Sequence, residues 1–155
     1  MANFWHLLAT FGISMLPVVE LRGAIPYGFA FELPWWQVMA VSVIGNLLPA
    51  PFIILFIRKI FDWLKDKGRF GSLVYRLEQK AKNGANKVLS HRLMWFGLFV
   101  LVAVPLPGTG AWTGALVAAI MDLRLKHAMP AIALGVLVAG VIMSVITYGV
   151  SAIFG

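Results

Sequence analysis

The chain has 155 residues, 61% of them hydrophobic, and its mean hydropathy is +0.88. Soluble domains average about 45–50% apolar residues, so this composition predicts a single all-α polytopic membrane domain over residues 1–155. The absence of cysteine excludes disulfides, thiolate metal sites and thiol nucleophiles. The net charge of +7 is concentrated in residues 58–92, which hold ten of the 13 Lys and Arg residues. A basic segment between apolar blocks is typical of a cytoplasmic loop and not of a nucleic-acid-binding surface.

The first apolar block, residues 3–33, is too long for one span of about 20 residues and too short for two. Its middle contains Pro17 and Pro26, with the charged residues Glu20 and Arg22 between them. Broken backbone and ionisable groups at membrane depth are tolerated only beside protein or water. We therefore predict a re-entrant hairpin over residues 3–33, and we do not interpret it as a secretory signal, because no basic residue precedes Arg22.

One kinked transmembrane helix is expected over residues 35–57, bent where Asn46 precedes Pro49 and Pro51. Residues 58–92 form the basic connection. Apolar residues there recur roughly at helical spacing, which fits either an interfacial amphipathic helix or an ordinary solvated helix.

The second apolar block repeats the first. We predict another re-entrant hairpin over residues 93–121, a surface turn at Asp122, and a transmembrane helix over residues 127–154. Pro17 then corresponds to Pro105, and Glu32 to Asp122 within about two residues. The predicted fold is an inverted repeat of a re-entrant hairpin plus a transmembrane helix.

Charge predicts the orientation. With the 58–92 loop in the cytoplasm, the first hairpin enters the inner (plasma) membrane from outside and the second from inside. Both chain termini are then extracytoplasmic.

The hairpin tips are the candidate substrate site, because the outgoing half-helices present unpaired N–H groups and the positive ends of their dipoles there. Arg22 adds a permanent positive charge that suits a phosphate, and Pro26 suits a first helical turn. Glycines in the second tip allow close backbone approach. The residues expected to contact substrate are Glu20, Arg22, Gly23, Pro26, Asn46, Pro105, Pro107, Gly108, Thr109, Gly110, Trp112 and Thr113.

Glu20 has two interpretations that stay open. As a desolvated carboxylate it would carry the exchangeable proton of a coupled transporter, and as a partner of Arg22 it would only hold the tip together. The three histidines lack metal-ligand spacing, so neither a metal nor a cofactor is expected. No nucleophile elbow, zinc-protease helix or nucleotide-binding loop is present, so an enzyme is not expected.

The two tip motifs resemble those of the small multidrug export family, which looks related to the DedA superfamily of membrane transporters. The motifs are Glu20-Leu21-Arg22-Gly23-Ala24-Ile25-Pro26 and Pro105-Leu106-Pro107-Gly108-Thr109-Gly110-Ala111-Trp112-Thr113-Gly114. The resemblance covers nearly the whole chain. It implies two opposed re-entrant hairpins and, in some branches, movement of polyprenyl-phosphate or other lipids across the bilayer. The long N-terminal extension of larger superfamily members is missing from this sequence.

The sequence thus favours a proton-coupled flippase or carrier of an anionic, polyprenyl-phosphate-like lipid headgroup, with the bilayer and this lipid as its partners. One alternative is an exporter of small cationic compounds with Glu20 as the counter-charge. Another is a membrane scaffold that transports nothing. A chain this small is also a candidate to form a homodimer around a pathway.

Overall fold

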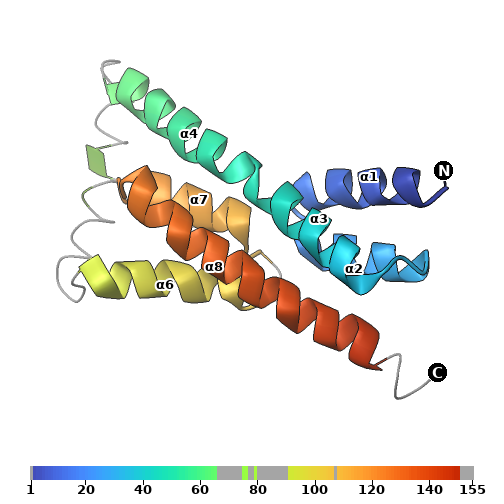
Figure 1. Cartoon of the computed structure of the whole chain (residues 1–155). Coiled ribbons are helices and arrows are strands. Elements are labelled where there is room, and N and C mark those ends of the chain that lie inside the picture. Colours follow the sequence, from blue (N-terminus) through green and yellow to red (C-terminus); the bar gives the residue numbers. More distant parts are fainter. Residues whose placement is uncertain (1, 66–74, 77–78, 80–90, 107, 151–155) are drawn as a thin grey trace.

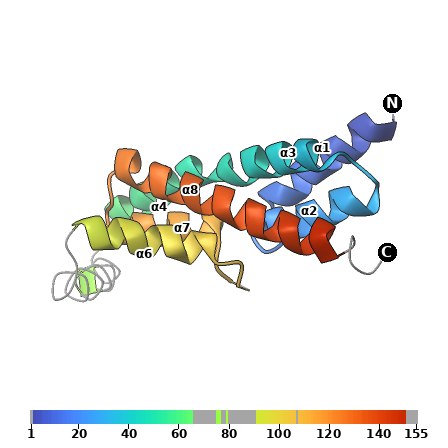
Figure 2. The same cartoon turned by 60° about the horizontal axis from the view of Figure 1, so that its bottom comes forward.

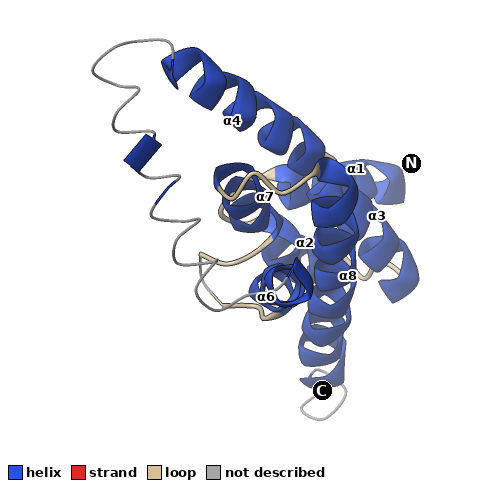
Figure 3. Ribbon diagram, turned by 90° about the vertical axis from the view of Figure 1, so that its left-hand side faces the viewer, coloured by secondary structure: helices blue, strands red, loops and turns tan. Residues whose placement is uncertain are grey.

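The computed structural model describes residues 2–65, 75–76, 79, 91–106 and 108–150. In these ranges every regular element is helical, and no strand occurs (Figure 3). The helices are α1 (Ala2–Met15), α2 (Glu20–Ala30), α3 (Trp35–Leu47), α4 (Pro49–Lys65), α6 (His91–Ala103), α7 (Ala111–Ile120) and α8 (Leu125–Ser144), followed by the π-helical η1 (Val145–Gly149). Pro107 and most of the predicted interfacial helix lie outside the described residues.

Two long helical segments form the centre of the molecule. α3 and α4 follow one another with a break at Leu48, immediately before Pro49, and α8 continues into η1. The segments Trp35–Trp63 and Leu125–Gly149 are each long and apolar enough to cross a membrane. α3 packs on α8, and the two long segments run in opposite directions (Figures 1 and 2).

The shorter helices form two pairs at opposite ends of the long segments (Figure 1). α1 and α2 pack together beside α3, while α6 and α7 pack together beside α8 and α4. The connections α1–α2 and α6–α7 meet near the middle of the molecule. We call residues 16–22, which include the first residues of α2, the first tip, and residues 104–112, which include the first residues of α7, the second tip.

The surface turns that end the two helix pairs have the same backbone geometry. Glu32 and Asp122 are both left-handed, with φ of 55° and 54°. In each turn the next residue bonds back five positions: Leu33 N–H donates to the Gly28 carbonyl (3.1 Å), and Leu123 N–H donates to the Ala118 carbonyl (2.9 Å). Positions 33 and 123 differ by 90, so a 90-residue offset relates the two halves here.

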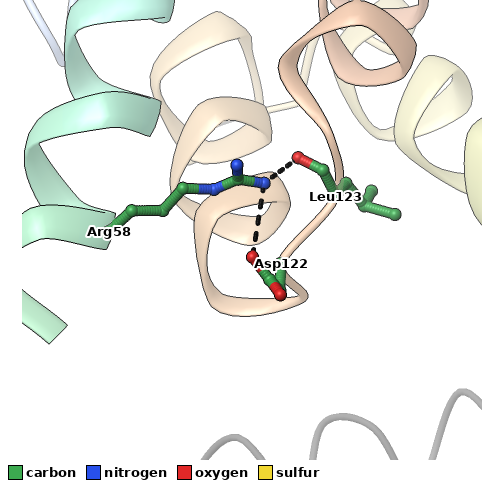
Figure 4. A network of polar contacts seen from close by, with 3 residues as sticks. All are labelled: Arg58, Asp122 and Leu123. Atoms are coloured by element: carbon green, nitrogen blue, oxygen red, sulfur yellow. Dashed lines mark hydrogen bonds and ion pairs between the residues drawn. The ribbon is translucent and has the colours of Figure 1, made fainter. Parts of the chain in front are cut away.

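Each half also contacts the turn of the other half with the equivalent side chain. Arg58 on α4 donates to the Leu123 carbonyl and lies 3.6 Å from the Asp122 carboxylate (Figure 4). Tyr148 in η1 donates its hydroxyl proton to the Leu33 carbonyl at 3.3 Å. Positions 58 and 148 are again 90 apart. Each half thus contacts the surface turn of the other half from a position at the same 90-residue offset.

A glycine of a long helix lies close to a backbone carbonyl of a neighbouring helix in both halves. A Cβ on Gly45 would lie 2.8 Å from the Phe11 carbonyl, and a Cβ on Gly135 would lie 3.0 Å from the Phe99 carbonyl. Small residues at such contacts let helices approach closely where lipid supplies no hydrophobic driving force between them. Phe11 and Phe99 are 88 residues apart, so the first helix of each pair follows an offset of 88.

Candidate functional site where the two tips meet

The carboxylate of Glu20 crosses from the first half of the chain to the second. Glu20 is the first residue of α2, its side chain is 4% exposed, and its backbone is left-handed with φ of 51°. Oε1 accepts a hydrogen bond from the backbone N–H of Trp112 in the first turn of α7 (3.2 Å). A carboxylate at a helix N-terminus satisfies an otherwise unpaired donor and meets the positive end of the helix dipole.

Gly110 makes this contact geometrically accessible. It precedes α7 with φ of 143° and ψ of −165°, a conformation essentially confined to glycine. A Cβ at this position would collide with the carboxylate of Glu20. A larger residue at position 110 would therefore both strain the backbone and separate the two tips.

Arg22 binds the other helix end at this junction, the C-terminal end of α6. Its guanidinium donates to the Leu106 carbonyl, to the Val104 carbonyl at 3.5 Å and to the Thr109 hydroxyl oxygen at 2.9 Å. These carbonyls follow the C-terminus of α6, where the helix dipole is negative. Glu20 and Arg22 thus each bind a helix end of complementary charge in the second tip, and among the described residues they form no ion pair with each other.

Trp112 completes a reciprocal arrangement. Its indole Nε1–H donates to the carbonyl of Met15, the last residue of α1, at 3.1 Å. The first tip therefore binds both helix ends of the second pair, and the second tip binds the C-terminus of α1. Because the halves meet through these polar bonds, movement of one relative to the other must break them.

Asn46 lies beside this junction, but its side-chain amide makes no hydrogen bond there to any residue that the structure describes. Its amide is close enough to interact with the Glu20 carboxylate, yet neither Oδ1 nor Nδ2 has a hydrogen-bond partner among the described residues. Ser42, one turn earlier on α3, is likewise buried, and its hydroxyl is unpartnered in the described part of the chain. Buried polar groups are normally hydrogen-bonded, so this pair requires an explanation.

The remaining predicted site residues are distributed differently. Thr113, in the first turn of α7, donates to the Gly108 carbonyl in the preceding loop (2.8 Å), and Gly23 lies against Val19 inside the first helix pair. Gly108 is exposed with φ of 83°, and Pro105 is half-buried beside the carbonyls that Arg22 binds. Pro107 is not among the described residues.

The predicted position of Pro26 in a first helical turn is wrong. α2 begins at Glu20, so Pro26 is its seventh residue and lies inside the helix. The chain has already reversed at residues 16–19, where Pro17 lies, and a second reversal at Pro26 is not needed. A proline inside a helix cannot donate to the carbonyl four residues before it, which here is the carbonyl of Arg22.

The profile of the family described as "Putative small multi-drug export protein" matches residues 20–142. The chain belongs to this family. No curated protein and no solved structure matches it. The family match begins at Glu20 and includes the Arg22 and Gly110 contacts, and together with the two apolar helices it indicates a membrane location. Among the residues that the structure describes, no three His, Asp or Glu side chains gather to hold a metal ion.

Two contacts and one buried hydroxyl of the structure were not anticipated. The sequence placed Arg58 only in a basic loop and gave Tyr148 and Ser42 no specific partner. For Ser42 a signal existed: it is four residues before Asn46 in an otherwise apolar helix, so both lie on one helix face. The hydrogen bonds from Arg58 to the Leu123 carbonyl and from Tyr148 to the Leu33 carbonyl depend on the packing of distant segments, and no local pattern indicates them.

Proposed function

We propose that this chain is an inner-membrane exporter of small cationic compounds, driven by protons that exchange at Glu20. The observation that carries the proposal is a carboxylate, 4% exposed, at the contact between two halves of a membrane protein of an export family. Ionisable groups at such depth are costly and mark substrate or proton pathways more often than structural positions.

In the proposed membrane arrangement the two helix pairs are re-entrant hairpins of an inverted repeat, as in the DedA superfamily. Two observations support it. α2 has 11 residues and α7 has 10, lengths of about 15–17 Å, roughly half of the hydrocarbon thickness of about 30 Å. The long segments run antiparallel and exchange equivalent contacts, so an axis relating them lies in the plane of the membrane if both segments cross it. The basic 58–92 loop is then cytoplasmic, and both termini are extracytoplasmic.

The contacts of the tips favour a cationic over an anionic cargo. Arg22 already donates to two carbonyls and a hydroxyl of the second tip, so a phosphate would have to displace these bonds. The N-terminus of α7, a natural anion site, already holds the carboxylate of Glu20. A cation needs no such displacement, because it would pair with the carboxylate itself.

The coupling follows from competition for one carboxylate. The ionised form of Glu20 accepts the Trp112 N–H and links the tips, and either a proton or a cationic compound reduces the charge that makes this bond strong. Binding of either one therefore favours the state in which the tips separate. The bound proton or compound must leave before the tips rejoin, so the two exclude each other at this carboxylate. Differential binding to the two states is what transport by alternating access requires.

Purified protein in liposomes tests the proposal, with ethidium as the cationic probe and an imposed pH gradient. Glu20→Gln should abolish gradient-driven ethidium movement, because glutamine preserves the hydrogen bond but exchanges no proton. Glu32→Gln is the matched control, because Glu32 is exposed and also left-handed. If Glu20→Gln transports ethidium as well as Glu32→Gln does, the proposal is wrong.

The second candidate is movement of an anionic, polyprenyl-phosphate-like lipid. The observation that favours it is the guanidinium of Arg22, which is half-exposed at the tip and carries the positive charge that a phosphate pairs with. A fluorescent lipid phosphate in the same liposomes tests it. In that case Arg22→Gln should be more damaging than Glu20→Gln, and ethidium should not move. A scaffold would move neither probe in any variant.

A further inference from the structure

Four buried polar residues of the first half lie on the two packed helices α1 and α3. Thr10, Ser14, Ser42 and Asn46 are each at most 1% exposed, and we call them the polar stripe. His6, Thr10 and Ser14 are four residues apart and share one face of α1, which packs on α3. The stripe begins near His6, whose ring stacks on Phe31 with centroids 3.9 Å apart.

The stripe ends at the junction of the tips. Ser14 lies directly against Gly45, because a Cβ on Gly45 would collide with its hydroxyl oxygen. Asn46 follows Gly45 in sequence and lies beside the Glu20 carboxylate. Buried hydroxyl and amide groups thus lie between the His6 end of α1 and the proposed proton-exchange residue.

The hydrogen bonds of the stripe leave many groups available. Thr10 donates to the His6 carbonyl at 2.7 Å and Ser14 to the Phe11 carbonyl at 2.7 Å, so both hydroxyl oxygens keep lone pairs. The Ser42 hydroxyl and both polar atoms of Asn46 have no partner among the described residues. An unsatisfied buried polar group costs roughly 1–3 kcal/mol, and water is the usual partner where protein supplies none.

The second half of the chain shows that the fold does not need these polar residues. With the offsets of 88 for the first helix and 90 for the long helix, the stripe corresponds to apolar, buried positions: Leu98, Val102, Ile132 and Val136. The same contact of a glycine with a helix carbonyl occurs in both halves, at Gly45 and at Gly135. One half packs with apolar side chains where the other buries hydroxyl and amide groups at a cost, so packing alone does not explain the polar residues.

We propose that the polar stripe binds water and conducts protons between the His6 end of α1 and Glu20. The inference rests on the proposed function, because it gives Glu20 a route to one side of the membrane. A proton arriving as hydronium passes along the bound water and is taken up by the carboxylate, leaving neutral water behind. Arg22 is the charged residue nearest to Glu20 in the described chain. Helices α3 and α7 carry no titratable residue, and the described α1 carries only His6.

Cysteine accessibility tests the stripe without measuring transport, because the natural chain has no cysteine. Full-length variants Thr10→Cys, Ser42→Cys and Asn46→Cys are reconstituted in liposomes and treated with a small, positively charged, membrane-impermeant methanethiosulfonate reagent. The matched controls are Leu98→Cys, Ile132→Cys and Val136→Cys. Asn3→Cys, exposed at the start of α1, reports the side to which the reagent has access.

We expect the stripe positions to react at least about tenfold faster than their controls, because the reactive thiolate forms in hydrated and not in apolar surroundings. Reaction should require reagent on the side that labels Asn3→Cys. Equal reactivity in the two halves, whether fast or absent, would overturn the proposal, as would labelling of the stripe only from the opposite side.

A second measurement keeps the two proposals distinguishable. Thr10→Val and Ser42→Ala change little volume and should slow proton uptake into pyranine-loaded liposomes by about tenfold or more if water must be held there. Unchanged uptake would overturn the water path. If ethidium does not move but the stripe is labelled and conducts protons, the cargo proposal fails and the path stands.

Discussion

Replacing Gly110 with alanine would perturb the contact on which the junction of the two tips depends. Two costs add. Alanine at φ of 143° and ψ of −165° pays about 1–3 kcal/mol of backbone strain. Its Cβ would also displace the Glu20 carboxylate from the Trp112 N–H, and a hydrogen bond to a charged group is worth about 1.5–3 kcal/mol. The expected loss of folding free energy is therefore about 2.5–6 kcal/mol.

The neighbouring Gly108 supplies the matched control. It also has positive φ (83°), but nothing lies within 4 Å of a Cβ built there. Gly108→Ala should therefore cost the strain alone, about 1–2 kcal/mol. Gly97→Ala, inside α6 with open space around it, should stabilise the protein by roughly 0.5–1 kcal/mol.

The assay is thermal unfolding of the purified protein in detergent, followed by intrinsic tryptophan fluorescence. A double-mutant cycle with Glu20→Ala isolates the contact, because Gly110→Ala should then cost only its strain. The reasoning is refuted if Gly110→Ala destabilises no more than Gly108→Ala, or if its cost is the same with and without the Glu20 side chain.

Three further changes test other contacts by the same unfolding assay. Trp112→Phe keeps an aromatic ring but removes the donor to the Met15 carbonyl, and should cost about 0.5–1.5 kcal/mol; no change would mean that α1 does not need this bond. Tyr148→Phe should cost a similar amount, about 0.5–1.5 kcal/mol, and an unchanged unfolding midpoint would argue against the hydrogen bond to the Leu33 carbonyl. Arg22→Lys should destabilise nearly as much as Arg22→Gln, because an ammonium cannot span three acceptors; full retention of stability by lysine would contradict this geometry.

The second tip changes how the charged pair at Glu20 and Arg22 is understood. The sequence left two interpretations: a transport site, or a structural pair within one hairpin. In the structure the two side chains diverge, and each binds a helix end in the other half. The contact is structural in its geometry, but a structure held by a buried carboxylate responds to protonation. The two interpretations are therefore compatible in one residue.

Much of the architecture is readable from the sequence because hydrophobic length and helix breakers are local properties. The apolar blocks, Pro17, Pro49 and Pro105 mark where helices lie and where they are interrupted, and the long apolar runs predict the two helices that can cross a membrane. The family is also indicated by local motifs around Glu20 and Gly110, and the family profile confirms it.

Tertiary structure alone decided which groups meet. Glu20 and Trp112 are 92 positions apart, and nothing near either residue specifies that the carboxylate of one meets the backbone N–H of the other. The same holds for Arg58 and Tyr148, whose partners are backbone carbonyls, present at every residue and invisible in a sequence pattern. The start of α2 at Glu20 was missed for a related reason: a left-handed glutamate is intrinsically unfavourable, and one of the contacts that hold it comes from Trp112 in the other half.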